Sequence, residues 1–520
     1  MQRNVTGPAV LVLVGTGLGA IVFLGGNPWI GVLALVGVGV FTYGVIKYSL
    51  RFTLVLALFF LAVFLPNRYD IQYAVNILGV NIRLAAVLTL LVSGALFHLV
   101  ALQRMRGRGR GAGIPTDLIV AGLALVGTVL LSVLAAAVRA GPPKQVTQDS
   151  LPVITPMLLY AVLGTEAWSE KEISAFTGAI IGAGLGVTTF SYIVVLGIQS
   201  FFKAMGWYSY GPWLERPFQA LGGGIAIGAF LLLVFPLALI LYSRTTRYWT
   251  RMFYLLCCLY FVSGIIMQDS RLILAITVVY LLFAGPKMRQ QGRSLALRYV
   301  TLAATALCIA YYGSQLNRYF ERYLILDNPS SQTRIASIPV ALRVFADHPL
   351  TGTGIGVVYP RGEERVAEAE VLPYRGLGEK LMLYGNLTTL VEPHNLYVMW
   401  PAELGVIGLI ALIVFGWRVG RFLRAASRLP DGPCLRDALL RGFVGGIVAF
   451  CVQMMGSSIL LNNLRVSIAF WIYLSVALDV AAAKLLARKT LAAQDSQTSA
   501  AALAGFEPAV LHPKDDLLTP

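Results

Sequence analysis

A histidine and an asparagine, His394 and Asn395, stand directly in front of a long apolar run. That run, 396–416, is apolar enough to enter a bilayer, so the imidazole is expected at a membrane surface. A neutral imidazole there could accept a proton near neutral pH and act as a general base. Glu392 is close enough in the sequence to orient the ring, and both Glu392 and Asn395 are expected to contact the substrate. The alternative is a histidine that caps the helix or anchors it at the interface.

Three arginines could hold an anionic substrate on the same side of the membrane. Arg271 ends the polar segment Gln268-Asp-Ser-Arg271 between two short apolar runs, where a guanidinium is costly unless it faces a wet cavity or an anion. Arg334 opens a helical stretch, and Arg343 follows nine positions later, so only one of them should face the site. A guanidinium binds phosphate with two donors at once. Pairing with a neighbouring aspartate, snorkelling to the headgroups and simple solvation remain the alternatives.

The second histidine of this region lies in the segment Asp347-His-Pro-Leu-Thr-Gly-Thr-Gly-Ile-Gly356. Its proline and its three glycines, spaced by two, predict a tight and exposed turn. A phosphate-binding loop is the alternative, but the spacing matches neither of the common glycine-rich phosphate motifs. We therefore expect His348 to belong to a structural turn that holds a loop to the membrane.

Polar and small residues also occur within the apolar run after His394. Glu403 is half a helical revolution away from the histidine and is expected to bond to a neighbouring helix. Pro401 lies between them and is expected to be the place where the helix kinks, if it kinks at all. Gly405 and Gly408 are expected to allow close helix packing rather than to take part in chemistry.

The composition is that of an integral membrane protein. Apolar residues make up 57% of the 520 residues and charged residues only 13%, about half the share of roughly 25% in soluble domains. The net charge of +16 does not indicate a nucleic-acid partner, because Lys and Arg fall in short clusters between apolar runs. The five cysteines and the scattered carboxylates show no metal-ligand spacing, so neither a metal nor another cofactor is predicted.

Apolar runs predict an all-α polytopic membrane protein with about fourteen spanning helices. Segment 152–164 is the shortest of these and could be re-entrant. The predicted spans are 8–26, 28–46, 52–66, 83–101, 117–137, 152–164, 175–199, 219–242, 250–267, 271–285, 299–313, 396–416, 439–461 and 465–484.

The distribution of charge orients these spans. With the N-terminus inside, every strongly basic loop falls on the cytoplasmic side, as the positive-inside rule requires, and only the acidic loop 166–172 is an exception in sign. Both termini are then cytoplasmic. The predicted domains are N-terminal spans over 1–313 (about eleven), a large periplasmic loop with short helices over 314–395, C-terminal spans over 396–484 (about three) and a disordered cytoplasmic tail over 485–520.

Three groups of residues together resemble the O-antigen ligase and O-antigen polymerase family of membrane glycosyltransferases. The matching residues are Gln268-Asp-Ser-Arg271, Arg334 with His348-Pro-Leu-Thr-Gly352, and His394-Asn395 with Gly405 and Gly408. The resemblance covers roughly 244–409 and, more loosely, the whole multispan layout. It implies a GT-C-like fold in the bacterial inner membrane.

The resemblance also implies an activity. A glycan would be moved, without a metal, from undecaprenyl pyrophosphate to an acceptor sugar such as the lipid A-core on the periplasmic side. His394 is expected to be the base, and Arg271 and Arg334 are expected to hold the pyrophosphate. The expected partners are this lipid-linked donor, a lipid-anchored or glycan acceptor, and membrane lipids.

Two other functions stay open. One is a repeat-unit polymerase of the same family, acting in O-antigen or exopolysaccharide synthesis. The other, from a different class, is a transporter or flippase of lipid-linked sugars. Transporters usually carry ionisable residues near the middle of the membrane, whereas the polar residues of this chain concentrate in one outer loop.

Overall fold

The computed structural model describes the greater part of the chain and is nearly all helical there. A short antiparallel hairpin, β1 (Val75–Ile77) and β2 (Val80–Ile82), is the exception among these residues. The fold confirms the predicted class, an all-α polytopic membrane protein. The described residues are 43–64, 75–77, 80–105, 113–138, 143–195, 224–268, 270–289, 338–339, 341–355, 395–430 and 435–503.

Eight helices within the described ranges are long and apolar enough to cross a membrane. They are α5 (Leu84–Met105), α6 (Thr116–Val138), α8 (Glu170–Val195), α10 (Gly224–Arg244), α11 (Tyr248–Met267), α16 (Leu396–Arg428), α17 (Leu435–Gln453) and α19 (Leu464–Leu503). Three shorter apolar stretches lie in α3 (Leu50–Phe64), α7 (Pro143–Leu163) and α12 (Arg271–Arg289). After α17 come the short η2 (Met454–Gly456) and α18 (Ile459–Asn462).

These eleven segments fall on eleven of the predicted spans. The predicted spans 8–26 and 299–313, and most of 28–46, lie outside the described residues, so the number fourteen stays a prediction. Helix α7 begins at Pro143, well before the predicted 152, and continues through Pro152 and Pro156. At the other end of the chain, α19 runs on to Leu503, whereas a disordered tail was predicted from residue 485. Alanine, leucine and the long polar residues that follow are strong helix formers, which explains the extension.

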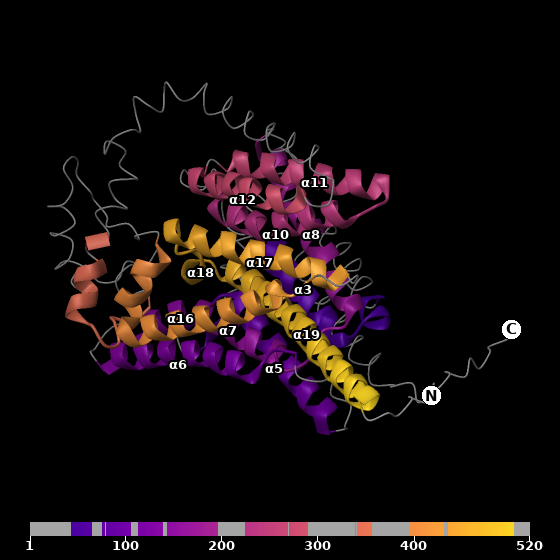
Figure 1. Cartoon of the computed structure of the whole chain (residues 1–520). Helices are drawn as coiled ribbons and strands as arrows, with labels where there is room; N and C mark the ends of the chain where they lie inside the picture. Colours follow the sequence, from indigo (N-terminus) through magenta and orange to yellow (C-terminus); the bar gives the residue numbers. More distant parts are fainter. Residues whose placement is uncertain are drawn as a thin grey trace.

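Helices α10 and α19 form the centre of the bundle. The most apolar window of each is 89% buried, because both are apolar on all sides rather than on one face. Figure 1 shows α19 running between α5, α6 and α7 on one side and α10, α11 and α12 on the other. Helix α10 packs against α17, α11 and α8, and α19 packs against α7, α17, α3 and α16.

A buried tyrosine hydroxyl connects three of these helices. The Tyr473 hydroxyl of α19 donates to Leu233 O of α10 at 2.9 Å and approaches Gly442 O of α17 at 3.3 Å. An added Cβ at Gly446 would collide with this hydroxyl, so a glycine there gives the tyrosine its room.

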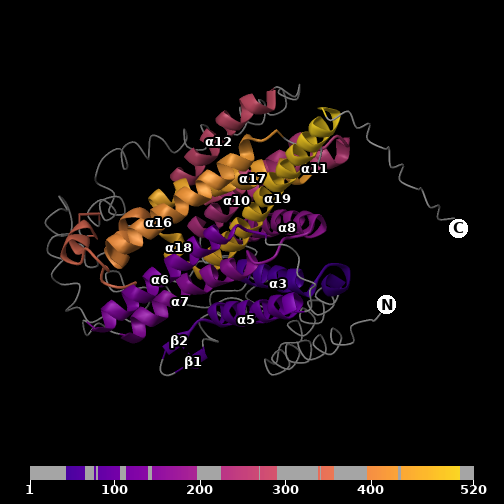
Figure 2. The ribbon, with the colours of Figure 1, turned by 60° about the horizontal axis from the view of Figure 1, so that its bottom comes forward.

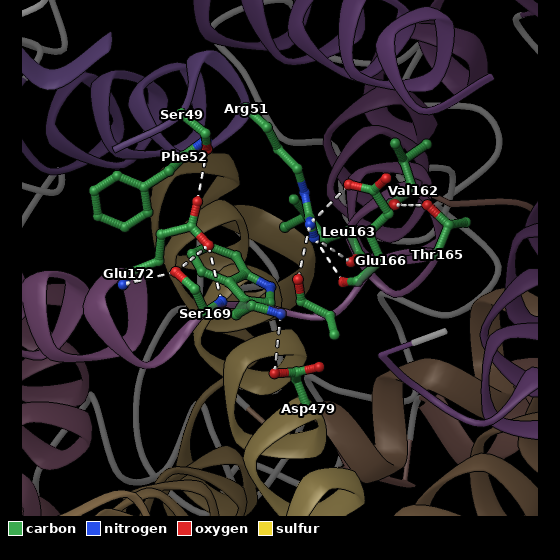
Figure 3. A network of polar contacts seen from close by, with 12 residues as sticks. Ser49, Arg51, Phe52, Val162, Leu163, Thr165, Glu166, Ser169, Glu172 and Asp479 are labelled. Atoms are coloured by element: carbon green, nitrogen blue, oxygen red, sulfur yellow. Dashed lines mark hydrogen bonds and ion pairs between the residues drawn. The ribbon is translucent and has the colours of Figure 1, made fainter. Parts of the chain in front are cut away.

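Charged residues are buried at the end of the bundle where α16 finishes and α17 begins. Figure 3 shows Arg51, Glu166 and Asp479 among them. We call Arg51, Glu166, Trp168, Arg436 and Asp479 the basal network. Arg51 pairs with Glu166 at 3.3 Å and donates to two backbone carbonyls of the α7–α8 connection, each at 2.9 Å. The Asp479 carboxylate accepts a hydrogen bond from the backbone N–H of Trp168 and another from the Arg436 guanidinium, both at 3.2 Å. The network therefore ties α3, α17 and α19 to one connecting segment.

A second carboxylate of the same segment starts helix α8. The Glu172 carboxylate accepts from the N–H of Ser169 at 2.9 Å, and the Ser169 hydroxyl accepts from the N–H of Glu172 at 3.3 Å. This reciprocal pair is a capping box. Ser49, just ahead of α3, donates to Glu172 at 2.6 Å (Figure 3). The acidic loop 166–172 breaks the predicted charge pattern because its buried carboxylates serve as internal partners.

We expect Tyr473→Phe to lower the free energy of unfolding by about 1 kcal/mol, because a buried carbonyl loses its donor. Thermal unfolding of the detergent-purified protein would measure the change. Tyr254→Phe is the matched control, since the Tyr254 hydroxyl has no hydrogen-bond partner among the described residues. Equal melting temperatures for the two variants would contradict a bridging role for Tyr473.

Candidate active site

Helix α16 is discontinuous at Gly405. This residue has φ 67° and ψ −168°, a left-handed conformation that glycine adopts at little cost, and it divides the helix into two parts. A break in a membrane helix leaves carbonyl groups at the end of the first part and N–H groups at the start of the second without helical partners. In a bilayer these groups have no water to bind, so the protein must supply partners.

The partners come from the turn that contains His348. The N–H groups of Thr353 and Gly354 donate to the carbonyls of Ala402 and Glu403, at 3.2 and 2.9 Å. In the other direction, the N–H groups of Val406 and Ile407 donate to the carbonyls of Pro349 and Leu350, at 2.7 and 3.3 Å. Four backbone hydrogen bonds thus seat residues 349–354, which we call the docked turn, in the break of α16.

Two glycines make this approach possible. Gly352 has φ 64°, and a Cβ there would overlap the backbone at Glu403 and Leu404. Gly405 faces it with φ 67°, and a Cβ there would overlap the backbone at Leu350 and Thr351. Each glycine is therefore required for two reasons: its backbone has a positive φ, and a side chain would prevent the two main chains from touching. This explains the glycines of the predicted turn better than a phosphate-binding loop does.

Side chains hold the two parts of α16 in place. The indole N–H of Trp400, before the break, donates to the carbonyl of Gly408, after it, at 2.9 Å. From the neighbouring α6, the Ser132 hydroxyl donates to the carbonyl of Glu403 at 2.9 Å. Glu403 itself is completely buried. The kink is thus at Gly405 rather than at Pro401. Gly405 and Gly408, which were expected to allow close helix packing, serve the break and the docked turn instead.

The beginning of α16 is fixed by one of the predicted substrate-binding residues. The Asn395 side chain accepts a hydrogen bond from the N–H of Tyr397 at 3.0 Å, as an N-cap residue does. The Tyr397 hydroxyl donates to the carbonyl of Cys451 in α17 at 2.9 Å. Asn395 therefore holds the start of the helix directly behind His394 in the sequence. His394 and Glu392 lie outside the described residues, as does Arg334.

The remaining predicted residues fall on two other elements. Arg343 lies on the helical residues 341–347 that lead into the docked turn; it is 64% exposed and pairs with Asp347 at 3.3 Å. This pairing accounts for Arg343 without a substrate. Arg271 is the first residue of α12, and its side chain is not among the described ones. The nearby Gln268 amide donates to Gly264 O at 3.2 Å.

The start of α12 lies at the same end of the bundle as the start of α16. Leu272, next to Arg271, lies so close to Gly456 of η2 that an added Cβ on this glycine would overlap it. The η2 segment in turn packs against α16. Figure 2 shows α16 beginning beside the helical residues that precede the docked turn. Three segments that carry predicted site residues therefore converge at one end of the protein.

Sequence reasoning missed Ser132 and Trp400, which secure the broken helix. A serine within the otherwise apolar run of α6 was a usable signal, because a hydroxyl in a membrane span needs an acceptor. Trp400 gave no such signal, since an indole near a helix start also suits a membrane interface.

The described fold defines a class of protein: a polytopic helical membrane protein with a discontinuous helix closed by a docked loop segment. Residues 253–413 match the family described as O-antigen ligase. The matched segment contains most of α11, all of α12, the docked turn and the break in α16, and it confirms the resemblance seen in the motifs. The family supports glycosyl transfer of the ligase or polymerase type in general. No curated protein matches the chain.

We expect Gly352→Ala and Gly405→Ala each to destabilise the protein strongly. The left-handed backbone alone costs an alanine roughly 1–2 kcal/mol, and the overlap of main chains adds to this. Gly416→Ala and Gly420→Ala in the same helix are the controls, because nothing lies within 4 Å of an added Cβ at either position. Thermal unfolding of the four purified variants tests whether the docked turn and the break in α16 depend on these glycines. Equal melting temperatures for all four variants would contradict that dependence.

Proposed function

We propose that the protein transfers a glycan from undecaprenyl pyrophosphate to an acceptor sugar, as an O-antigen ligase does, on the periplasmic side of the bacterial inner membrane. The single observation that supports this most is the convergence of the starts of α12 and α16 with the docked turn inside the segment matched by the ligase family. The acceptor in lipopolysaccharide synthesis would be the lipid A-core.

In the proposed reaction the acceptor hydroxyl oxygen attacks the anomeric carbon of the donor sugar. The bond between that carbon and the pyrophosphate oxygen breaks, and its electron pair leaves with the pyrophosphate. The hydroxyl proton passes to the His394 imidazole, which must be neutral to take it. Charge grows on the pyrophosphate as the bond breaks, so fixed guanidinium groups at Arg271 and Arg334 would favour the transition state over the ground state. The step uses no metal.

The described geometry supports the placement of these groups. The Asn395 cap fixes the helix that follows His394 in the sequence, and the docked turn, which follows Arg334 in the sequence, is seated in the same helix. Positioning of this kind matters because small displacements of a catalytic group lower the rate steeply. The exposed Arg343, paired with Asp347, leaves Arg334 as the better candidate of the two loop arginines.

A repeat-unit polymerase is the alternative within the family, because the family supports both types of transfer. Disrupting the gene separates them by the product that accumulates. Loss of a ligase leaves lipid-linked polymer, whereas loss of a polymerase leaves single repeats.

We expect His394→Ala to fold, insert and bind the lipid-linked donor, yet to lose about 10²–10⁴ in transfer rate, the usual contribution of a general base. His348→Ala should keep much of its activity, because the docked turn is held by backbone groups. A transfer assay on both purified variants, beside a donor-binding measurement, makes the comparison. Near-normal turnover in His394→Ala would remove this histidine from the mechanism.

We expect Lys to replace Arg271 or Arg334 poorly, because lysine lacks the planar fork that holds a pyrophosphate with two donors. Arg343→Lys is the control, since this exposed side chain needs only to face Asp347. Donor affinity and transfer rate should fall in the first two variants and stay unchanged in the third. If all three lysine variants match the wild type, the arginines act only as diffuse charge.

A further inference from the structure

A cleft opens at the basal end of the bundle, beside the basal network. Its volume is about 520 Å³, and its charged lining residues are Lys47, Lys171, Arg436 and Glu170. The cleft lies among the residues just ahead of α3, the first turns of α8 and the start of α17. The break in α16 lies roughly 35 Å away along that helix, at 1.5 Å per residue from 405 to 428. The cleft is therefore separate from the candidate active site.

Three cationic side chains face this cleft against one carboxylate. The other carboxylates nearby are already engaged: Glu172 accepts from Ser49 and Ser169, and Asp479 accepts from Trp168 and Arg436. Arg436 uses one of its terminal nitrogens for that ion pair, and its buried Nε–H has no hydrogen-bond partner among the described residues. The cleft thus offers cationic donors in excess of the acceptors that the protein supplies.

The cleft is also partly apolar and lies beside side chains of the kind found at a membrane interface. Ile173, Ala175 and Leu439 form part of its wall. Just outside it, Ile46 is 78% exposed, and Tyr43 accepts a hydrogen bond from Lys47 at 2.9 Å. Lysine and tyrosine in this pairing are typical of the headgroup region. A ligand with an anionic head and apolar chains fits this mixture better than a free anion.

From these contacts we infer that the cleft binds the phosphate-bearing headgroup of an anionic phospholipid, in the leaflet that meets this end of the bundle. Lys47 and Lys171 bind the phosphate from two elements, and Arg436 lies between it and Asp479. The acyl chains lie along the apolar wall. Basic clefts between membrane helices recognise such headgroups by the same chemistry. The inference does not depend on the proposed transfer, because it concerns the opposite end of the protein.

Native mass spectrometry of the full-length protein in detergent, titrated with phosphatidylglycerol or zwitterionic phosphatidylcholine, tests this site. The wild type is expected to prefer phosphatidylglycerol. Lys47→Gln with Lys171→Gln should weaken phosphatidylglycerol binding about tenfold, since each basic residue near a membrane surface contributes to anionic-lipid affinity. Arg436 is left intact, because its removal would leave Asp479 buried without its cation.

The matched control is Arg424→Gln with Arg428→Gln, which removes two exposed positive charges on the last turns of α16, outside the cleft. This variant should bind phosphatidylglycerol as the wild type does. Equal losses in the two double variants would show that only overall charge matters and would overturn the site. Complete displacement of phosphatidylglycerol by millimolar inorganic phosphate would overturn its assignment to a lipid.

Discussion

The break in the backbone of α16 at Gly405 is the constraint on which the rest of the candidate site depends. Backbone groups exposed inside a bilayer cost several kcal/mol each unless they are paired, and four such groups at this break pair with the docked turn. Helix α16 and the docked turn are consequently one mechanical unit. Neither can shift without uncovering polar backbone, so the docked turn is held as firmly as the helix itself.

Hydropathy was sufficient to predict most of the fold. Spans such as α6, α10 and α11 agree with the prediction within a few residues, because long apolar runs have few other stable states in a chain of this composition. The start of α7 was missed because its first turns are polar. The predicted end of α19 was too early, because the polar composition after residue 484 suggested disorder. Strong helix formers in that stretch continue the helix instead.

The family resemblance was predictable from the motifs, whereas the way the broken helix is built was not. The motifs correctly indicated the family, and the glycines around Gly352 correctly indicated a turn. No local pattern could show that this turn fits a break some fifty positions later, since the contact depends on two backbones meeting in space. Pro401 was the expected kink because proline removes a helical hydrogen bond; Gly405 was the actual one because only glycine permits both the left-handed backbone and the contact.

A discontinuous helix is also a feature of transporters, where the free backbone groups at the break bind the substrate. The break in α16 is used differently. The carbonyls of Ala402 and Glu403 and the N–H groups of Val406 and Ile407 are all occupied by the docked turn, and Ser132 adds a second donor to Glu403. Each of these groups therefore already has a hydrogen-bond partner within the protein. A break filled by the protein itself fixes the two parts of α16 relative to one another, which differs from the open, substrate-binding break of a transporter.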